Sequence, residues 1–143
     1  MKNKLVWLFL ALMIIQCKSQ QQGGSKDVTL ENTYWKLVEI NPKPVTTPEG
    51  GREVHMMLTR EGESKALKGH AGCNSLGGDY QLDGNKIKFQ TITTRMYCEL
   101  QMEVENQFTS MLTAADHYRL RDSELELLAG DKVLGKFKAV PEK

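Results

Sequence analysis

Short segments in which apolar and polar residues alternate cover much of this 143-residue chain, and no other feature limits its fold as strongly. Alternate side chains of a strand point to opposite faces, so a period of two predicts strands with one buried face. Turn signals such as Asp83-Gly84-Asn85 and Gly130-Asp131 separate the segments and supply the positive φ of tight hairpins. We therefore expect antiparallel strands within residues 34–40, 52–59, 86–89, 117–121, 124–127 and 133–139.

The first of these segments predicts which side chains are buried together. Within Tyr34–Ile40, Trp35 and Leu37 would share one face, and Val38 and Ile40 would lie on the other. Residues 41–51 follow with three prolines and two glycines, and we interpret them as a loop.

A single segment has the period of a helix. Between residues 99 and 115 the apolar positions recur every three or four residues, and acidic residues are concentrated in the first half, where the helix dipole favours them. The predicted fold class is therefore α+β, mainly β: a curved antiparallel sheet or partial barrel with one helix packed across it. The stripe that we expect to face the core consists of Leu100, Val104, Phe108, Met111, Leu112 and Ala115.

The amino terminus resembles a bacterial export signal. Lys2 and Lys4 precede an apolar run over residues 5–15, which as a helix would span about 16 Å, too short for a bilayer core of about 30 Å. Cys17 directly after this region resembles the lipobox cysteine of lipoproteins, although Gln16 stands where a small residue is usual. We expect a signal peptide at 1–16, lipidation at Cys17 and a flexible tether at 17–29, followed by one domain at 30–140; ordinary cleavage near Ser19 is the alternative.

The charge balance excludes some partners. Lys2 and Lys4 leave with the signal, so 17 of the 19 Lys and Arg residues face 18 Asp and Glu. Neither a basic stripe with interleaved aromatics nor a polybasic cluster is present, so we expect no nucleic acid partner and no electrostatic binding to a membrane. The predicted location is the bacterial envelope, as an outer-membrane lipoprotein facing the periplasm or the cell surface, with the lipid at Cys17 as the membrane contact.

The two remaining cysteines form an even pair in a chain that enters an oxidising compartment. A bridge between Cys73 and Cys98 would close a loop of about 26 residues and stabilise the fold by about 3 kcal/mol. Two free buried thiols, or a zinc site using His70 with both cysteines, are the alternatives. We expect the disulfide, with no metal and no cofactor.

Several short motifs follow one another along the chain. They are Thr33-Tyr34-Trp35-Lys36-Leu37, Gly72-Cys73-Asn74-Ser75-Leu76-Gly77-Gly78 with Tyr80, Thr93-Thr94-Arg95-Met96-Tyr97-Cys98, Glu105 with Phe108, Leu125-x-Leu127 and Leu134-Gly135-Lys136-Phe137. In this order they resemble the META/HslJ-like domain family.

The resemblance implies a small β-rich domain with one helix, often found in envelope lipoproteins. One relative is heat-inducible and linked to antibiotic tolerance, and another, in a parasite, is linked to virulence. No enzymatic activity is established for the family. The resemblance also places both cysteines within motifs, which favours a structural bridge, while Tyr97 replaces the small residue common before the second cysteine.

A catalytic reading would make Cys73 a nucleophile and His70 its base. The glycines and Asn74 beside Cys73 instead suit a tight turn, and we interpret Ser75 as a turn residue too. Other polar residues receive structural interpretations: His55 and His117 as surface histidines, Asp79, Asp83 and Asp131 as turn residues, and Thr93 and Thr94 as caps for free amides in the turn into the helix.

The predicted function is that of a non-enzymatic, lipid-anchored envelope protein in stress tolerance or envelope maintenance. It would bind a protein, a peptide or a lipid-like partner. The alternatives are a small hydrolase or thiol enzyme using Cys73, and a structural spacer.

Overall fold

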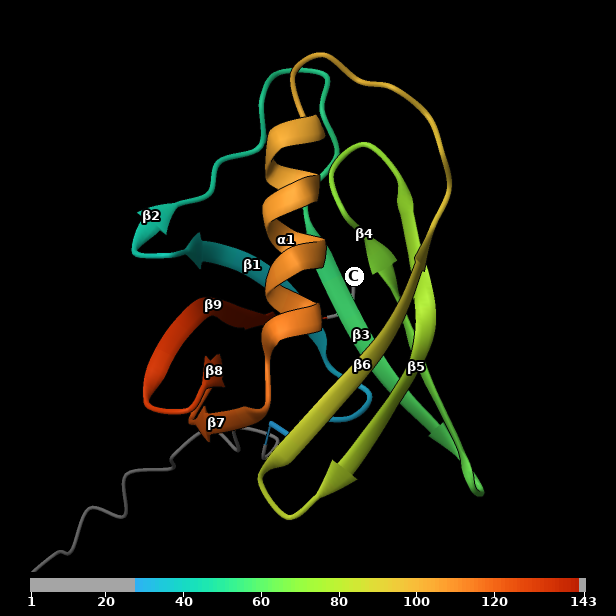
Figure 1. Cartoon of the computed structure of the whole chain (residues 1–143), viewed down its shortest axis with the longest axis vertical. Helices are drawn as coiled ribbons and strands as arrows, with labels where there is room; N and C mark the ends of the chain where they lie inside the picture. Colours follow the sequence, from blue (N-terminus) through green and yellow to red (C-terminus); the bar gives the residue numbers. More distant parts are fainter. Residues whose placement is uncertain (1–27, 142–143) are drawn as a thin grey trace, which may run out of the picture.

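The computed structural model describes residues 28–141, and within them the chain forms a curved antiparallel sheet with one helix packed on it (Figure 1). This confirms the predicted fold class. The predicted signal peptide and Cys17 lie outside the described residues. The elements are β1 Tyr34–Ile40, β2 Lys43–Pro44, β3 His55–Glu61, β4 Ser64–His70, β5 Ser75–Asp83, β6 Lys86–Thr93, α1 Met102–Ala114, β7 His117–Arg121, β8 Glu124–Ala129 and β9 Lys132–Val140.

The strands pair in the order β2-β1-β3-β4-β5-β6-β7-β8-β9, and β9 pairs with β1 again, so the sheet curls back on itself. The junction between β6 and β7 is short. β6 and β7 share only the pair Lys86↔His117, whereas β5 and β6 pair along their whole length. In the sequence α1 falls between β6 and β7, and it packs across the sheet at this junction (Figure 1).

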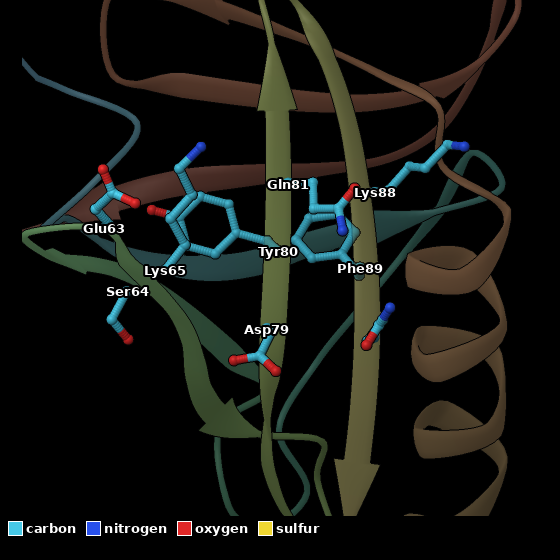
Figure 2. A pocket seen from close by; sticks show the side chains of 9 residues that line it. Glu63, Ser64, Lys65, Asp79, Tyr80, Gln81, Lys88 and Phe89 are labelled. Carbon is cyan, nitrogen blue, oxygen red and sulfur yellow. The ribbon is translucent and has the colours of Figure 1, made fainter.

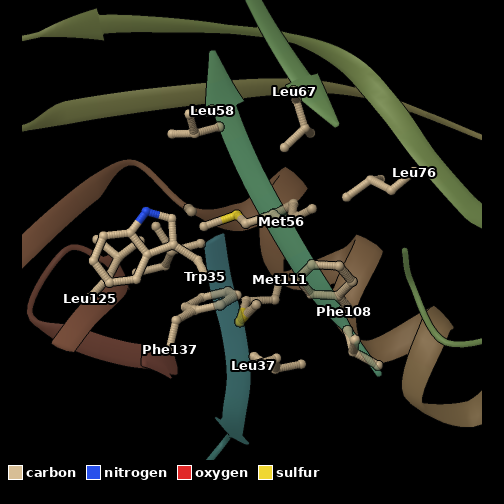
Figure 3. Packing of buried hydrophobic residues seen from close by; sticks show 14 of the residues in the cluster. Trp35, Leu37, Met56, Leu58, Leu67, Leu76, Phe108, Met111, Leu125 and Phe137 are labelled. Carbon is tan, nitrogen blue, oxygen red and sulfur yellow. The ribbon is translucent and has the colours of Figure 1, made fainter. Parts of the chain in front are cut away.

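The core lies between α1 and the inner face of the curled sheet (Figure 3). Trp35, Phe108 and Phe137 are fully buried, and the rings of Phe108 and Phe137 pack with centroids 6.1 Å apart. The indole Nε1 of Trp35 donates a hydrogen bond to the Leu30 carbonyl at 2.9 Å, which satisfies its one polar group. In β3, within the predicted strand 52–59, Met56 and Leu58 are buried as well, as a period of two requires for one face.

One predicted face in β1 is wrong. Ile40 was expected beside Val38, but it is buried with Trp35 and Leu37. The register with β9 shifts between Leu37 and Glu39, so a β-bulge inserts one residue and returns Ile40 to the core side. A bulge of this kind leaves the hydrophobic pattern ambiguous by one position.

The sequence interpretation also missed three strands. β2 lies within the predicted loop 41–51, and β4 carries only Leu67 as a large apolar residue. β5 was obscured by the glycines of the segment read as a turn, so Ser75 opens a strand and Asp79 lies within it. Gly78 has a φ of +138°, and a Cβ there would run into the Gln90 carbonyl of β6, so the strand requires glycine at this position.

The helix is shorter than predicted. It begins at Met102, so Leu100 precedes it and is 76% exposed, while Phe108, Met111 and Leu112 face the core as expected. Glu105, one of the acidic residues in the first half of the predicted helix, is buried. Within residues 28–141 no helix is both long and apolar enough to cross a membrane.

A pinned apolar segment as candidate interaction site

Three loops meet at one end of the sheet, and the side chain of Asn74 joins two of them. Asn74 is 1% exposed. Its Oδ1 accepts hydrogen bonds from the Met96 amide at 2.7 Å and from the Thr94 hydroxyl at 2.9 Å, and its Nδ2 donates to the Met96 carbonyl at 3.0 Å. The backbone of Met96 is therefore held on both its donor and its acceptor, as a neighbouring strand would hold it.

Glu105 completes this network from α1. Its Oε2 accepts a hydrogen bond from the backbone amide of Asn74 at 2.7 Å, and its Oε1 accepts one from Nδ2 of Asn74 at 2.8 Å. Both groups that face the Glu105 carboxyl are donors, so each of its oxygens accepts a hydrogen bond, and this explains how the polar side chain can be buried here. Among the described residues every buried side-chain nitrogen and oxygen has a hydrogen-bond partner.

Gln101, just before α1, fixes the third loop. Its Oε1 accepts a hydrogen bond from the Arg52 amide at 3.0 Å, and its Nε2 donates one to the Arg52 carbonyl at 2.8 Å. Thr94 plays a related part, since its hydroxyl accepts the Ser75 amide at 3.2 Å. Thr94 thus caps an amide at the start of β5 and not one at the helix, whose first turn has no side-chain cap.

The predicted cysteine pair lies in the same place. Cys73 and Cys98 are joined by a disulfide, with an S–S distance of 2.03 Å and Cα atoms 5.6 Å apart. In this arrangement neither sulfur is a thiolate, so neither can act as a nucleophile or bind zinc with His70. Within residues 28–141 no group of three or more His, Cys, Asp or Glu side chains is placed to hold a metal ion.

His70 does not serve Cys73 as a base. The residue is buried, and its Nδ1 accepts the Gly72 amide at 3.2 Å. Burial, helped by the charges of Arg52 and His55, lowers the pKa of His70 below its usual value. The ring is therefore a neutral hydrogen-bond acceptor that supports the loop at neutral pH.

The segment held by these contacts is apolar and exposed. Ile92, Met96, Tyr97 and Leu100 are 73%, 60%, 82% and 76% exposed, and they are the large hydrophobic side chains of the described chain that remain in solvent. We call residues 92–100 the apolar segment. Its backbone is tied at Thr94, Met96 and Cys98, so these side chains cannot reach the core by a local collapse of the loop.

Two other polar clusters lie away from this segment and have structural roles. On the outer face, Tyr34 stacks on His55 at 4.3 Å and donates to Glu53 at 3.1 Å, while Glu53 also pairs with Lys36. Burial, together with that hydrogen bond, raises the pKa of Tyr34 to about 12, so the phenol stays protonated at neutral pH. His117 pairs with Asp116 at 2.7 Å. The sequence predicted a surface position for His117, and the residue is half-buried.

A shallow hollow of about 580 Å³ lies where β4 and β5 separate (Figure 2). Their pairing ends at Ala66↔Asp79, and the ring of Tyr80 fills the gap beyond. The Tyr80 hydroxyl donates to Glu31 at 2.6 Å, and burial with this bond raises the pKa of Tyr80. Lys65 and Lys88 share the rim with Glu63 and Asp79, so charges of both signs surround the hollow without converging on one point.

Comparison with known proteins identifies the domain. The META domain matches residues 28–141. The chain belongs to the META domain family. It is 24% identical to heat shock protein HslJ of Escherichia coli strain K12 over 137 residues, which cover 94% of each chain.

Solved structures similar to this META domain show the same fold. A protein from Burkholderia xenovorans solved by NMR has a TM-score of 0.63 and 22% identity, covering 79% of this chain and 85% of its own. Another NMR structure has a TM-score of 0.58 and 25% identity, covering 78% and 94%. A DUF4847 family protein from Bacteroides vulgatus has a TM-score of 0.57 and 15% identity, covering 80% and 96%.

Sequence reasoning did not single out the apolar segment of this META domain. Leu100 was assigned to the helix stripe, and Asn74 was read only as a turn residue. One signal was available: Met96 and Tyr97 are large apolar residues that fit neither the period of the preceding strand nor that of the helix. The long-range bonds of Asn74 to Met96 and Glu105 have no counterpart in local sequence patterns.

Proposed function

We propose that this chain is a binding protein of the bacterial envelope that presents its apolar segment to a polypeptide partner. The observation that carries the proposal is the exposure of Ile92, Met96, Tyr97 and Leu100 on a backbone that the surrounding contacts hold in place. All four side chains come from one segment of nine residues, and contiguous exposed apolar patches mark interaction surfaces, whereas single exposed apolar residues need no explanation. Tyrosine is also enriched at protein interfaces, where its ring is buried and its hydroxyl stays hydrogen-bonded.

Two rival functions fit the structure less well. A thiol enzyme needs a free sulfur at position 73, and here that sulfur is joined to Cys98. A structural spacer has no need of exposed apolar side chains, which cost solubility. The proposal also draws on the similarity to HslJ, a heat shock protein, and extends to this chain a part in stress tolerance or envelope maintenance without enzymatic activity.

We further propose that the domain is held to the membrane by lipid at Cys17. The described chain starts at the lower end of the molecule in Figure 1, whereas residues 94–101 arch over its upper end. The lipid anchor and the apolar segment would therefore belong to different ends of the domain, and a flexible tether would leave the segment free to meet a partner.

The experiment that tests the binding function places a photo-crosslinking amino acid at position 97 of the full chain in intact cells. A matched control carries the crosslinker at Lys132, which is exposed on β9, three strands away from β6 in the sheet order. We expect one discrete adduct at position 97, none at 132, and at least a fivefold weaker adduct when Leu100→Ser is added. Equal labelling at both positions, or labelling that ignores Leu100→Ser, would refute the binding surface.

The anchor has its own test. Growth with radiolabelled palmitate should label the native chain, and Cys17→Ala should abolish the label and release the protein from membrane fractions. Label retained by Cys17→Ala would show that the anchor is assigned to the wrong residue. The crosslinking result does not depend on this outcome.

A further inference from the structure

Two hollows follow one side of α1, between the helix and the β1–β2 hairpin. The upper one, of about 250 Å³, lies between the first half of α1 and β2, which is beside the helix in Figure 1. The lower one, of about 360 Å³, lies between the rest of the helix, the turn at Asn41 and Leu134 of β9. Gln107 lines both, so they form one continuous depression along α1, which we call the α1 cleft.

The α1 cleft opens from the apolar segment, because Leu100 belongs to both. Leu100 and the half-buried Val104 form one wall of the upper hollow, and the exposed Pro44 and half-buried Val45 form the other. An apolar surface therefore continues from the end of the molecule into the cleft. A partner that covers the segment and also enters the cleft removes more apolar surface from water than one that covers the segment alone.

Backbone hydrogen bonds hold the wall opposite α1 in place. The Val45 amide donates to the Val38 carbonyl at 2.9 Å, and the Asn41 amide donates to the Leu134 carbonyl at 2.9 Å. The β1–β2 hairpin is thus tied to β1 and to β9, so the cleft is present before a partner arrives. Binding to a preformed surface avoids the cost of ordering loops.

The charges of the upper hollow indicate what kind of partner fits it. Lys43 and Glu103 line it from opposite walls, and neither forms an ion pair with any residue between 28 and 141. An acidic segment would be repelled by Glu103 and a basic one by Lys43. An uncharged backbone suits both walls, because its carbonyls accept hydrogen bonds from Lys43 and its amides donate to Glu103.

The lower hollow favours the same kind of partner, since all the residues that line it are uncharged. Met111 and Leu134 form an apolar floor, and the exposed amides of Asn41 and Asn106 can both donate and accept, as the backbone of an extended chain requires. From residue 103 to residue 114 the helix rises about 17 Å, at about 1.5 Å per residue. An extended chain covers that length with about five residues, at about 3.3 Å each.

We propose that the α1 cleft binds an uncharged, extended segment of a partner polypeptide. Apolar side chains of the segment would fill the two hollows, and its backbone would lie between Lys43 and Glu103. The same partner would cover the apolar segment at Leu100. This inference rests on the proposed binding function and specifies the chemistry of the partner.

The test titrates the full chain, held in detergent micelles, with a capped heptapeptide of alternating valine and threonine. Two further peptides carry glutamate or lysine in place of the threonines. Binding is measured from the NMR shifts of the Val45 and Val104 amides, which lie on the two walls and report the cleft separately from the micelle. The uncharged peptide should bind at least about fivefold more tightly than either charged one.

Three variants sharpen the result. Gln107→Trp puts a large ring where the two hollows meet, so it should weaken binding of the uncharged peptide at least about tenfold. Thr113→Trp is the matched control, because Thr113 is exposed on α1 and lines neither hollow, and it should change binding less than about twofold. Glu103→Gln removes the charge that repels the acidic peptide, so this peptide should bind at least about threefold more tightly.

Four results would overturn the inference. These are unchanged amide shifts at millimolar uncharged peptide, a charged peptide that binds the native chain as tightly as the uncharged one, equal effects of Gln107→Trp and Thr113→Trp, and shifts that grow with protein concentration alone, which would identify a second copy as the occupant. If an adduct forms at position 97 in cells while the peptide leaves the cleft unchanged, the binding function survives and only the cleft is wrongly assigned. Failure of the native chain to form that adduct would refute the binding function itself.

Discussion

The contacts of Asn74 allow its contribution to stability to be worked out before measurement. Asn74→Ala removes four side-chain hydrogen bonds, two to the Met96 backbone, one from Thr94 and one to Glu105. A buried hydrogen bond contributes about 1 kcal/mol net, and more when its partner is charged. Because the bonds belong to one network they do not add fully. We expect a loss of about 3–4 kcal/mol in the free energy of unfolding.

The assay is urea denaturation followed by circular dichroism, with the Cys73–Cys98 bridge intact in both proteins. Asn106→Ala is the matched control, because it is the same change at an asparagine that is exposed on α1, and it should change stability by less than about 0.5 kcal/mol. The slope of unfolding free energy against urea should stay constant, which shows that only stability has changed. A loss below about 1 kcal/mol for Asn74→Ala would refute the view that this side chain holds the apolar segment.

Three further predictions follow from the same contacts. Glu105→Gln puts an amide donor against the donors of Asn74, so it should cost about 1–3 kcal/mol in urea unfolding, and a neutral result would contradict the assigned donors. Gly78→Ala should destabilise the fold by at least about 2 kcal/mol, because the added Cβ would meet the Gln90 carbonyl. The control Gly77→Ala has open space around the added Cβ and should cost less than about 1 kcal/mol. Equal losses for the two variants would rule out the close approach of Gly78 to β6. Finally, because the pKa of His70 is lowered in the folded protein, the unfolded chain binds more protons below about pH 6.5. The free energy of unfolding should therefore fall as the pH drops through that value, and His70→Asn should flatten the dependence of stability on pH. An unchanged dependence in His70→Asn would exclude His70 as its source.

Most of the fold was predictable because its strands follow a period of two and its helix a period near four. The errors have identifiable causes. A β-bulge after Leu37 moved Ile40 to the core, and the glycines needed for close strand contact made β5 resemble a turn. Sequence periodicity records side-chain direction but neither register nor the approach of two backbones.

The candidate site was less predictable than the fold. The cysteine pair was expected from compartment and family resemblance, yet the exposure of Tyr97 and Leu100 depends on where α1 begins. That point is set by Gln101 and Asn74, which bond to residues 22 to 49 positions away in the chain. Such contacts exist only once the sheet has closed.

The most direct test of the central claim is the ratio of crosslinked adduct at position 97 to adduct at position 132, measured in intact cells. If the apolar segment is the binding surface, that ratio should exceed about ten and fall at least fivefold with Leu100→Ser. A ratio near one would show that the segment is exposed without being a binding surface.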